Sequence, residues 1–417
     1  MNFRLFSLKA VTLLQKNQHT RINMNKLFRG LCLISFLVLA STAGTANADD
    51  VQTPFGMLPS QIKRGSTSPS GNLHVQGVQV DAKRGYIYYS FTTELVKTDL
   101  KGNVIGSVQG LTCHLGCIEL DTETGLLYGS MEYKDDIIGQ GILRAIKQGQ
   151  GGNTGKNCFY VGIFDTNKIT RAGMSPTTDG VLTAAYLPDV VAMYQAKVVN
   201  NGKKLDHKYG CSGIDGISLG PQFGKTDGKK LLNVALGIYG DNERTDNDYQ
   251  ILLQYDPVKL QKVAKPLVSG NFHQSGMKAM NTYFVFTGNT TWGVQNMDYD
   301  KASHRWYMAV YVGKKPTFPN YYLFAIDGTK KPVKQTLKGF VPAQKGLVLS
   351  LAEDGLKDAA TGLRGWNFID GSTGFESLGQ GYFYISHPGR DEQKRQQCTL
   401  TLYKWTGNAE EPFVQQK

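Results

Sequence analysis

Three stretches of the chain align with one another without gaps, so the sequence carries an internal repeat. They read HVQGVQVDAKRGYIYYS from His74, HLGCIELDTETGLLYGS from His114 and GVQNMDYDKASHRWYMA from Gly293. Each copy has an aspartate seven residues after its first residue and a tyrosine seven residues further on. A recurring segment of this kind predicts repeated supersecondary units that stack to share a core.

Each copy predicts a strand, a short turn and a second strand. The aspartate accepts hydrogen bonds from turn amides, a hairpin loop follows, and an aromatic-rich strand returns beside the first. A third strand is predicted in four places, at ELVKTDLKGN, YVGIFDTNK, YQILLQYDP and YYLFAIDGT. This spacing is typical of a blade of a β-propeller.

Less regular copies begin near Cys211 and near Ser372. The sequence therefore contains five candidates for the innermost strand of a blade, and the long interval 133–210 holds either another blade, around VLTAAYLP, or loops. We predict an all-β fold, a β-propeller of five to seven blades. A β-sandwich with long loops is the alternative.

The N-terminal segment has the three parts of a secretory signal peptide. A basic start follows Met24, Leu31–Leu39 is almost wholly apolar, and Ala46-Asn47-Ala48 ends the segment. We predict that residues 1–48 are a leader with its true start at Met24, and that 49–417 form a single propeller domain that is secreted or periplasmic. No later apolar run is long enough to span a membrane.

Charge limits the classes of ligand that the protein can bind, and cysteine content limits its disulfides. The leader holds six Lys and Arg residues and no acid, so its removal lowers the formal net charge from +12 to +6. A mildly basic surface is compatible with an anionic substrate. Nucleic acid is disfavoured, because no dense Lys/Arg stripe with interleaved aromatics occurs. Five cysteines remain after cleavage, which permits up to two disulfides in an oxidising compartment and leaves at least one cysteine unpaired.

His74 and His114 occupy the same repeat position and are predicted on adjacent blades. The innermost strands of a propeller surround a channel, so both imidazoles are expected at one mouth, where they suit a general base or a metal site. The alternative is that each caps its strand by bonding to backbone. His273, in NFHQSG, is a third candidate for the same mouth.

The sequence is compatible with binding of a divalent metal, but it contains no metal-binding motif. Three histidines from different blades would suit zinc with an open position. Asp241, Asp246 and Asp248 would suit calcium, but the spacing and the glycine of an EF-hand are missing.

Several loop residues are candidates for binding an acidic sugar. Arg244 and Arg364 would clamp a carboxylate, and Trp292 and Trp366 are the aromatic candidates for stacking on a sugar ring. Tyr133 and Tyr239 end second strands and are candidates for a general acid. The alternatives are surface ion pairs for the arginines and packing for the tyrosines.

Several runs, among them HVQGVQVD, CHLGCIELD, YGCSGIDGI, GIYGDNERTDNDYQ, TGNTTWGVQNMDYD and RGWNF, resemble a group of exported bacterial proteins that carry no assigned activity. The layout is more distantly similar to secreted propeller polysaccharide lyases that act on uronate-containing glycans. That likeness implies histidine, tyrosine and arginine at the propeller mouth, matched here by residue type and not by a shared motif.

These observations lead to two hypotheses. The first is a polysaccharide lyase that cleaves a uronate-containing glycan by β-elimination. An arginine would neutralise the carboxylate, His74 or His114 would remove the neighbouring proton, and Tyr133, Tyr239 or the second histidine would protonate the leaving oxygen. The second is a non-catalytic glycan- or protein-binding propeller of the cell envelope. The sequence does not decide whether the protein is an enzyme, and a metal-dependent hydrolase is a third class.

Overall fold

The computed structural model describes residues 50–68, 73–146, 157–268 and 270–417. The predicted leader lies outside these residues. Ala48–Lys417 form one compact unit. Its described part is built almost entirely of strands, with three α-helices: α1(Ile137–Ala145), α2(Pro188–Gln195) and α3(Pro257–Val263).

The strands form five principal antiparallel sheets, and each sheet is one blade of a propeller. The blades are, in chain order, β4(Val75–Asp81), β5(Tyr86–Phe91), β6(Glu94–Asp99) and β7(Val104–Val108); β8(His114–Asp121), β9(Leu126–Tyr133), β10(Cys158–Asp165) and β11(Leu182–Tyr186); β14(Cys211–Gly220), β15(Leu231–Ile238), β16(Tyr249–Tyr255) and β17(Asn281–Phe286); β18(Thr291–Asp300), β19(Arg305–Tyr311) and β20(Leu323–Asp327); β25(Phe375–Gly379), β26(Tyr382–Arg390), β27(Gln396–Trp405) and β28(Phe413–Gln415).

Further strands extend or flank the blades. The third blade continues through β22(Lys345–Leu349), which pairs in parallel with β17, and then β21(Val333–Thr336). The others are β1(Asp50–Thr53), β2(Gly56–Pro59), β3(Gln61–Gly65), β12(Lys197–Asn200), β13(Lys203–Asp206), β23(Leu356–Lys357) and β24(Arg364–Gly365).

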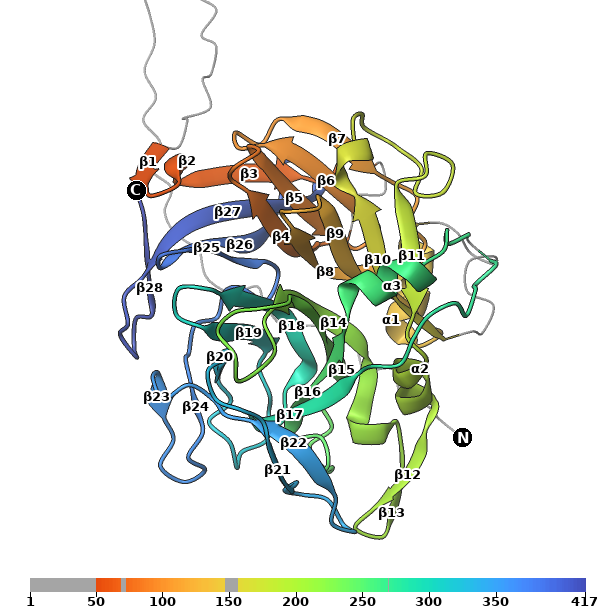
Figure 1. The fold of residues 1–417 in the computed structure, drawn as a ribbon, viewed down its shortest axis with the longest axis vertical. Helices are drawn as coiled ribbons and strands as arrows, with labels where there is room; N and C mark the ends of the chain where they lie inside the picture. The colour runs from red at the N-terminus through yellow and green to blue at the C-terminus, as the bar shows by residue number, and fades with distance from the viewer. Residues whose placement is uncertain (1–49, 69–72, 147–156, 269) are drawn as a thin grey trace, which may run out of the picture. The chain divides into compact units, whose positions relative to one another are not determined.

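The first strands of the five blades form a closed ring. Each contacts the next in the order β4, β8, β14, β18, β25, and β25 contacts β4 again. Figure 1 shows these strands gathered toward the centre, with β7, β11, β22 and β28 at the periphery. The predicted propeller is therefore confirmed, with five blades, and each inner strand begins at or within a few residues of a position that the repeat predicts.

The last blade is completed by a strand from the start of the domain. β3 pairs antiparallel with β27, from Gln61 opposite Thr401 to Gly65 opposite Gln397. The ring is thus held closed by hydrogen bonds between segments near opposite ends of the chain. Such closure leaves few free strand edges.

The repeated aspartates act as the sequence predicts. Oδ1 of Asp81 accepts the amide of Arg84 at 2.9 Å, and Oδ2 of Asp300 accepts the amide of Ser303 at 2.9 Å. All four predicted third strands are present, as β6, β10, β16 and β20. The interval 133–210 holds no extra blade in its described part, because VLTAAYLP forms β11, the outer strand of the second blade.

The described cysteines stabilise the core as apolar side chains. Cys113, Cys117, Cys158, Cys211 and Cys398 are all buried, and none of them forms a disulfide within the described part of the chain, although the sequence permits up to two. Burial raises the pKa of the Cys113 thiol to about 12, which keeps it protonated. No described helix has the length and apolar character needed to cross a membrane.

A ring of polar side chains crosses the channel near the ends of the inner strands. Each inner strand contributes one buried member: Gln79, Glu119, Ser218, Asp298 and Glu376. The Gln79 amide donates to Glu376 at 2.6 Å, and Asp298 accepts from the amide of Ser377. Burial raises the pKa of all three carboxyl groups; the charge of Asp298 raises those of Glu119 and Glu376 further, and the charge of Glu119 also raises that of Glu376.

This ring makes a prediction for stability. Burial first, then the charge of Asp300, raises the pKa of Asp298 to about 7, against an ordinary value of 3.8. A raised folded-state pKa contributes stability that is fully present below the unfolded pKa and is lost as pH rises through the folded one. As the pH rises from about 5 to about 8.5, the free energy of unfolding of wild type should fall by about 2 kcal/mol more than that of Asp298→Asn. This difference is below the ceiling that about 1.36 kcal/mol per unit of pKa shift allows.

Denaturant unfolding at a series of pH values measures this difference. Asp227→Asn, at an exposed turn acid, is the matched control and should track wild type. Parallel pH profiles for wild type and Asp298→Asn would show that Asp298 does not take up a proton on folding.

Candidate functional site

A cavity of about 430 Å³ opens at the mouth of the channel where the inner strands begin. Four blades contribute to its wall, and α1 adds a fifth part. The polar lining consists of His74, Gln76, Thr92, His114, Glu132, Lys134, Ser212, Asp215, Trp292, Gln295 and Tyr311; the remaining lining is Leu73, Ile138, Gly141, Ile142, Ile214 and Gly237. Acid, base and aromatic groups therefore share one enclosed space.

His114, Glu132 and Lys134 form a buried ion-pair network on one wall. His114 and Glu132 are cross-strand partners on β8 and β9, with His114 Nδ1 3.1 Å from Glu132 Oε2. Lys134 Nζ lies 2.9 Å from the same oxygen and donates to the Ser212 carbonyl at 2.9 Å. Glu132 Oε1 accepts the Ile214 amide at 2.6 Å. Both carboxylate oxygens are thus engaged by donors.

The network fixes the protonation of its members. Burial alone would lower the pKa of His114, but its bond to Glu132 and the charges of Asp215 and Glu132 raise it above its usual value. Burial would likewise raise the pKa of Glu132, yet Lys134 and His114 hold it below its usual value. The network therefore favours the charged forms of His114, Lys134 and Glu132, with both basic groups beside one carboxylate.

His74 has the opposite character. Its Nδ1 donates to the Val75 carbonyl at 2.8 Å, which leaves Nε2 as the lone-pair nitrogen, 3.5 Å from the Gln76 amide nitrogen. Burial lowers the pKa of His74, opposed by the bond to Val75 and reinforced by the charge of His114. A neutral imidazole whose Nε2 carries a lone pair, engaged here only by the long contact with Gln76, is the form that a general base requires.

Asp215 and Tyr311 supply groups that hold protons. Burial, with a smaller contribution from Glu132, raises the pKa of Asp215 to about 7, and its Oδ1 accepts the Cys117 amide at 3.2 Å. Burial and the charge of Asp215 raise the pKa of Tyr311 to about 12, so the phenol stays protonated near neutral pH. Either group is suited to act as a proton donor.

The structure brings together His74, His114 and Trp292 among the residues that the sequence predicts for the site. Trp292 combines a backbone φ of 68° with a position on the cavity wall. Its ring meets Tyr239 at a centroid distance of 5.5 Å. A bulky residue in this backbone region costs stability, and such strain is most often found at functional sites.

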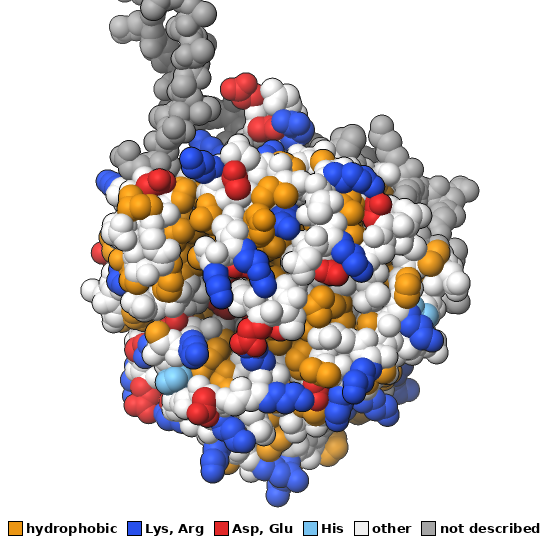
Figure 2. Space-filling model, turned by 45° about the horizontal axis from the view of Figure 1, so that its top comes forward, with side chains coloured by type: hydrophobic (Ala, Val, Ile, Leu, Met, Phe, Trp, Pro, Cys, Tyr) orange, Lys and Arg blue, Asp and Glu red, His pale blue; other side chains and the backbone are white. Residues whose placement is uncertain are grey.

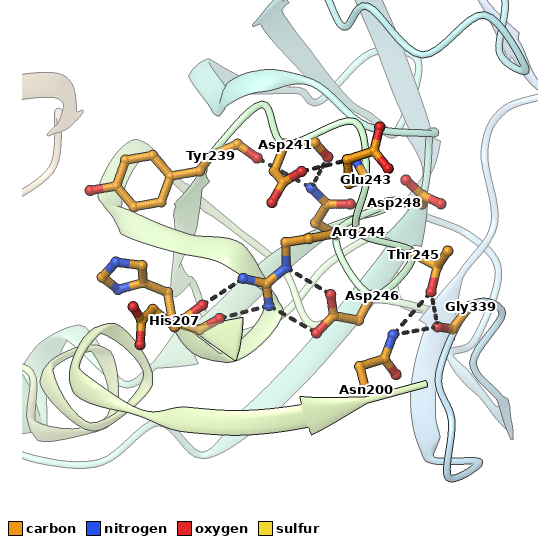
Figure 3. Close-up of polar contacts among 12 residues, drawn as sticks. Asn200, His207, Tyr239, Asp241, Glu243, Arg244, Thr245, Asp246, Asp248 and Gly339 are labelled. Carbon is orange, nitrogen blue, oxygen red and sulfur yellow. Dashed lines mark hydrogen bonds and ion pairs between the residues drawn. The ribbon is translucent and has the colours of Figure 1, made fainter. Parts of the chain in front are cut away.

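Arg244 is held in place by hydrogen bonds and an ion pair to neighbouring residues (Figure 3). It is not among the residues that line the cavity. Its guanidinium binds Asp246 through two bonds of 2.8 and 2.9 Å and donates to the carbonyls of Asp206 and His207. Tyr239 also lies outside the lining, with its hydroxyl donating to Asp136 at 3.0 Å. Asp246 and the carbonyls of Asp206 and His207 occupy the guanidinium of Arg244, which therefore has no free side for a substrate carboxylate.

The other predicted residues lie elsewhere. Tyr133 is buried, packs against Phe272 with its ring tilted, and lines only a small neighbouring cavity. His273 accepts the amide of Ser275 and contacts the Lys265 carbonyl. Arg364 lines a separate cavity of about 490 Å³, and the neighbouring Trp366 is a buried core residue.

The described residues contain no group of three or more His, Cys, Asp or Glu side chains placed to hold a metal ion. Each of the three aspartates proposed for calcium has a different partner in the structure. Asp246 pairs with Arg244, Asp248 pairs with Lys315 at 2.5 Å, and Asp241 accepts the amide of Glu243.

Glu132, Lys134, Asp215 and Tyr311 were not predicted, although the repeat carries a signal for two of them. Thr92, Glu132 and Tyr311 each lie 18 residues after the first residue of their copy, namely His74, His114 and Gly293. All three line the cavity. Tyr133 follows Glu132 on the same strand and therefore faces the opposite side of the sheet.

The outer surface adds no single-sign patch on the face that Figure 2 shows. Acidic and basic side chains are interspersed there, with the basic ones more numerous toward the lower edge. The basic groups relevant to a ligand are therefore those inside the cavity, His114 and Lys134, which lie there with the carboxyl groups of Glu132 and Asp215.

The fold and the cavity define a five-bladed β-propeller with a polar, titratable pocket at one mouth. No protein-family model matches the chain, and no curated protein matches it either. Among solved structures it is similar to a GH43 β-1,3-galactosidase with galactodeoxynojirimycin, at 11% identity and a TM-score of 0.40, covering 83% of this chain and 95% of that one. It is also similar to the Dos1 propeller, at 9% identity and a TM-score of 0.27, covering 84% and 73%. At this distance the likenesses carry no argument about activity.

Proposed function

We propose that the protein is an exported lyase that cleaves a uronate-containing glycan by β-elimination at the cavity. The observation that carries this proposal is the placement of His74 and His114 in one cavity, where burial lowers the pKa of His74, whereas the burial of His114 is outweighed by its bond to Glu132 and by nearby negative charges, which raise its pKa. Elimination next to a carboxylate needs both a base for the carbon acid and a cation beside the carboxylate. Export rests on the predicted leader alone.

In this proposal, different lining residues carry out the separate steps of the elimination. Nε2 of His74 removes the proton on the carbon next to the uronate carboxylate, and the resulting charge is stabilised by His114 and Lys134. The electron pair forms a carbon–carbon double bond as the bond to the glycosidic oxygen breaks. Tyr311 or Asp215 gives a proton to that leaving oxygen. The arginines named from the sequence have no part in this scheme.

A hydrolase that uses two carboxylates fits the same cavity less well. Such enzymes need one carboxylate free to act as nucleophile or base and one carboxylic acid. Asp215 suits the acid, but Glu132 is occupied by His114, Lys134 and the Ile214 amide. No second unengaged carboxylate lines the cavity.

The test incubates the protein from Asp49 onward with polygalacturonate, alginate, heparosan and chondroitin. Ultraviolet absorbance of the unsaturated uronate reports elimination, since hydrolysis does not form that double bond. A rise with one polymer supports the lyase. A flat trace with every polymer, from protein shown to be folded, would contradict it, and retained binding in that case would favour the non-catalytic propeller.

Trp292 is expected to bind the sugar and not to take part in proton transfer. Trp292→Ala should weaken binding of a uronate oligosaccharide about tenfold, equivalent to about 1.4 kcal/mol, because it removes an aromatic face from the cavity wall. Titration calorimetry measures the change. Trp292→Phe keeps an aromatic ring and should retain most of the affinity; equal affinities for wild type and Trp292→Ala would remove Trp292 from the site.

A further inference from the structure

The floor of the cavity is closed by side chains that link the inner strands. Asn296 of β18 donates to the Gln76 carbonyl of β4 at 2.8 Å and to the Ser372 carbonyl at 2.9 Å. The Cys117 thiol of β8 lies 3.4 Å from the Asn296 amide oxygen. Asn296 and Cys117 are buried. Directly beneath the lining residues, therefore, one asparagine spans the channel.

The channel is closed a second time further from the mouth. Gln79 bridges β4 to Glu376 of β25, and its amide oxygen accepts the Leu120 amide of β8 at 2.8 Å. The buried ring described above occupies this level. A ligand that enters at the mouth has no path through the propeller.

Most of the circumference of the cavity is walled. Residues of the first four blades line it, and α1 supplies an apolar wall of Ile138, Gly141 and Ile142. The helix is anchored where it begins: Asp136 accepts the amides of Ile138 and Gly139, and a side chain at Gly139 would overlap the Lys134 carbonyl oxygen. This wall is therefore a fixed part of the site.

We infer that the cavity receives the end of a uronate chain and not its interior. The inference rests on the proposed function and specifies its substrate: short oligosaccharides, or polymers that are shortened from one end. A well with a closed floor, walled by four blades and α1, admits a terminus, whereas a chain that continues in both directions needs a groove open at two ends. The volume of about 430 Å³ lies within the range of small-ligand pockets.

The experiment follows the uronate polymer that gives the largest absorbance rise, measuring viscosity and product size during the reaction. Short products from the first time point, with viscosity nearly unchanged, are the expected result. An early fall in viscosity with products of intermediate length would overturn the inference while leaving the lyase intact. Without any absorbance rise the lyase itself fails, and binding stoichiometry then decides. One protein bound per chain supports the inference; many per chain, or no binding, overturns it.

Two neighbouring isoleucines of α1 provide a matched pair. Ile138 lines the cavity, whereas Ile137 is 78% exposed and absent from the lining. Ile138→Ala should raise the KM for a uronate trisaccharide about fivefold, since it removes part of the wall against which the terminal residue packs. Ile137→Ala should match wild type. Equal KM values for the two variants would overturn the role of this wall.

Discussion

His74→Ala is expected to lower the rate of elimination by about 10²- to 10⁴-fold while leaving the fold intact. The imidazole donates Nδ1–H to the Val75 carbonyl and holds Nε2 as an acceptor in the cavity. Its lowered pKa keeps it neutral near pH 7, and no other neutral imidazole lines the cavity. Loss of the ring thus removes the base without removing a core residue.

The pH dependence separates this role from simple packing. Activity should rise as His74 loses its proton, at a pH below 6.5, and fall as His114 loses its proton, at a pH above 6.5. His74→Ala should lose the acid limb, and added imidazole should restore part of the rate. His387→Gln, on β26 outside the cavity, is the control and should match wild type. A fully active His74→Ala protein would exclude His74 as the base.

The repeat determined how much of the fold the sequence could predict. Its Asp-turn-Tyr pattern recurs because each blade needs the same hairpin, so the inner strands at His74, His114 and Gly293 were predicted directly. The two histidines followed from the same alignment, because equivalent positions of a ring of blades meet at one mouth.

The site residues predicted from residue type alone, Arg244 and Arg364, do not line the cavity. Arg244 and Arg364 were selected because loop arginines bind carboxylates, but the partner of Arg244 is Asp246, two residues away. An ion pair between two residues so close in the chain does not recur in the other copies of the repeat, so the alignment of the copies does not reveal it. Glu132 lies at the same repeat position as Thr92 and Tyr311, but these three side chains differ in chemical type, so the repeat has no constant residue there to mark the site. Asp215 lies on β14 within an irregular stretch of its register with β15, between Ile214 and Ile217. Alternation counted along one strand does not survive such bulges.

Lys134→Met is expected to cost about 3–5 kcal/mol of unfolding free energy, because it leaves Glu132 buried with its main compensating charge removed. Lys134 Nζ lies 2.9 Å from Glu132 Oε2, and both side chains are about 95% buried, with exposures of 5% and 4%. Methionine is close in length to the lysine stem, so the loss would come from charge and hydrogen bonding more than from a cavity. Denaturant unfolding near pH 7 measures the change.

The double variant Lys134→Met/Glu132→Gln distinguishes an uncompensated charge from lost packing. Removing the carboxylate charge as well should recover a large part of the loss, since a neutral amide beside His114 no longer needs a buried counter-charge. Lys197→Met is the control: its pair with Asp206 is exposed on both sides, at 84% and 60%, and its loss should not be measurable. If Lys134→Met proved as mild as Lys197→Met, Lys134 would not be the group that keeps Glu132 ionised, and His114 would be the remaining basic partner that does so. The same measurement therefore tests the electrostatic basis of the proposed acid–base pair without relying on any substrate.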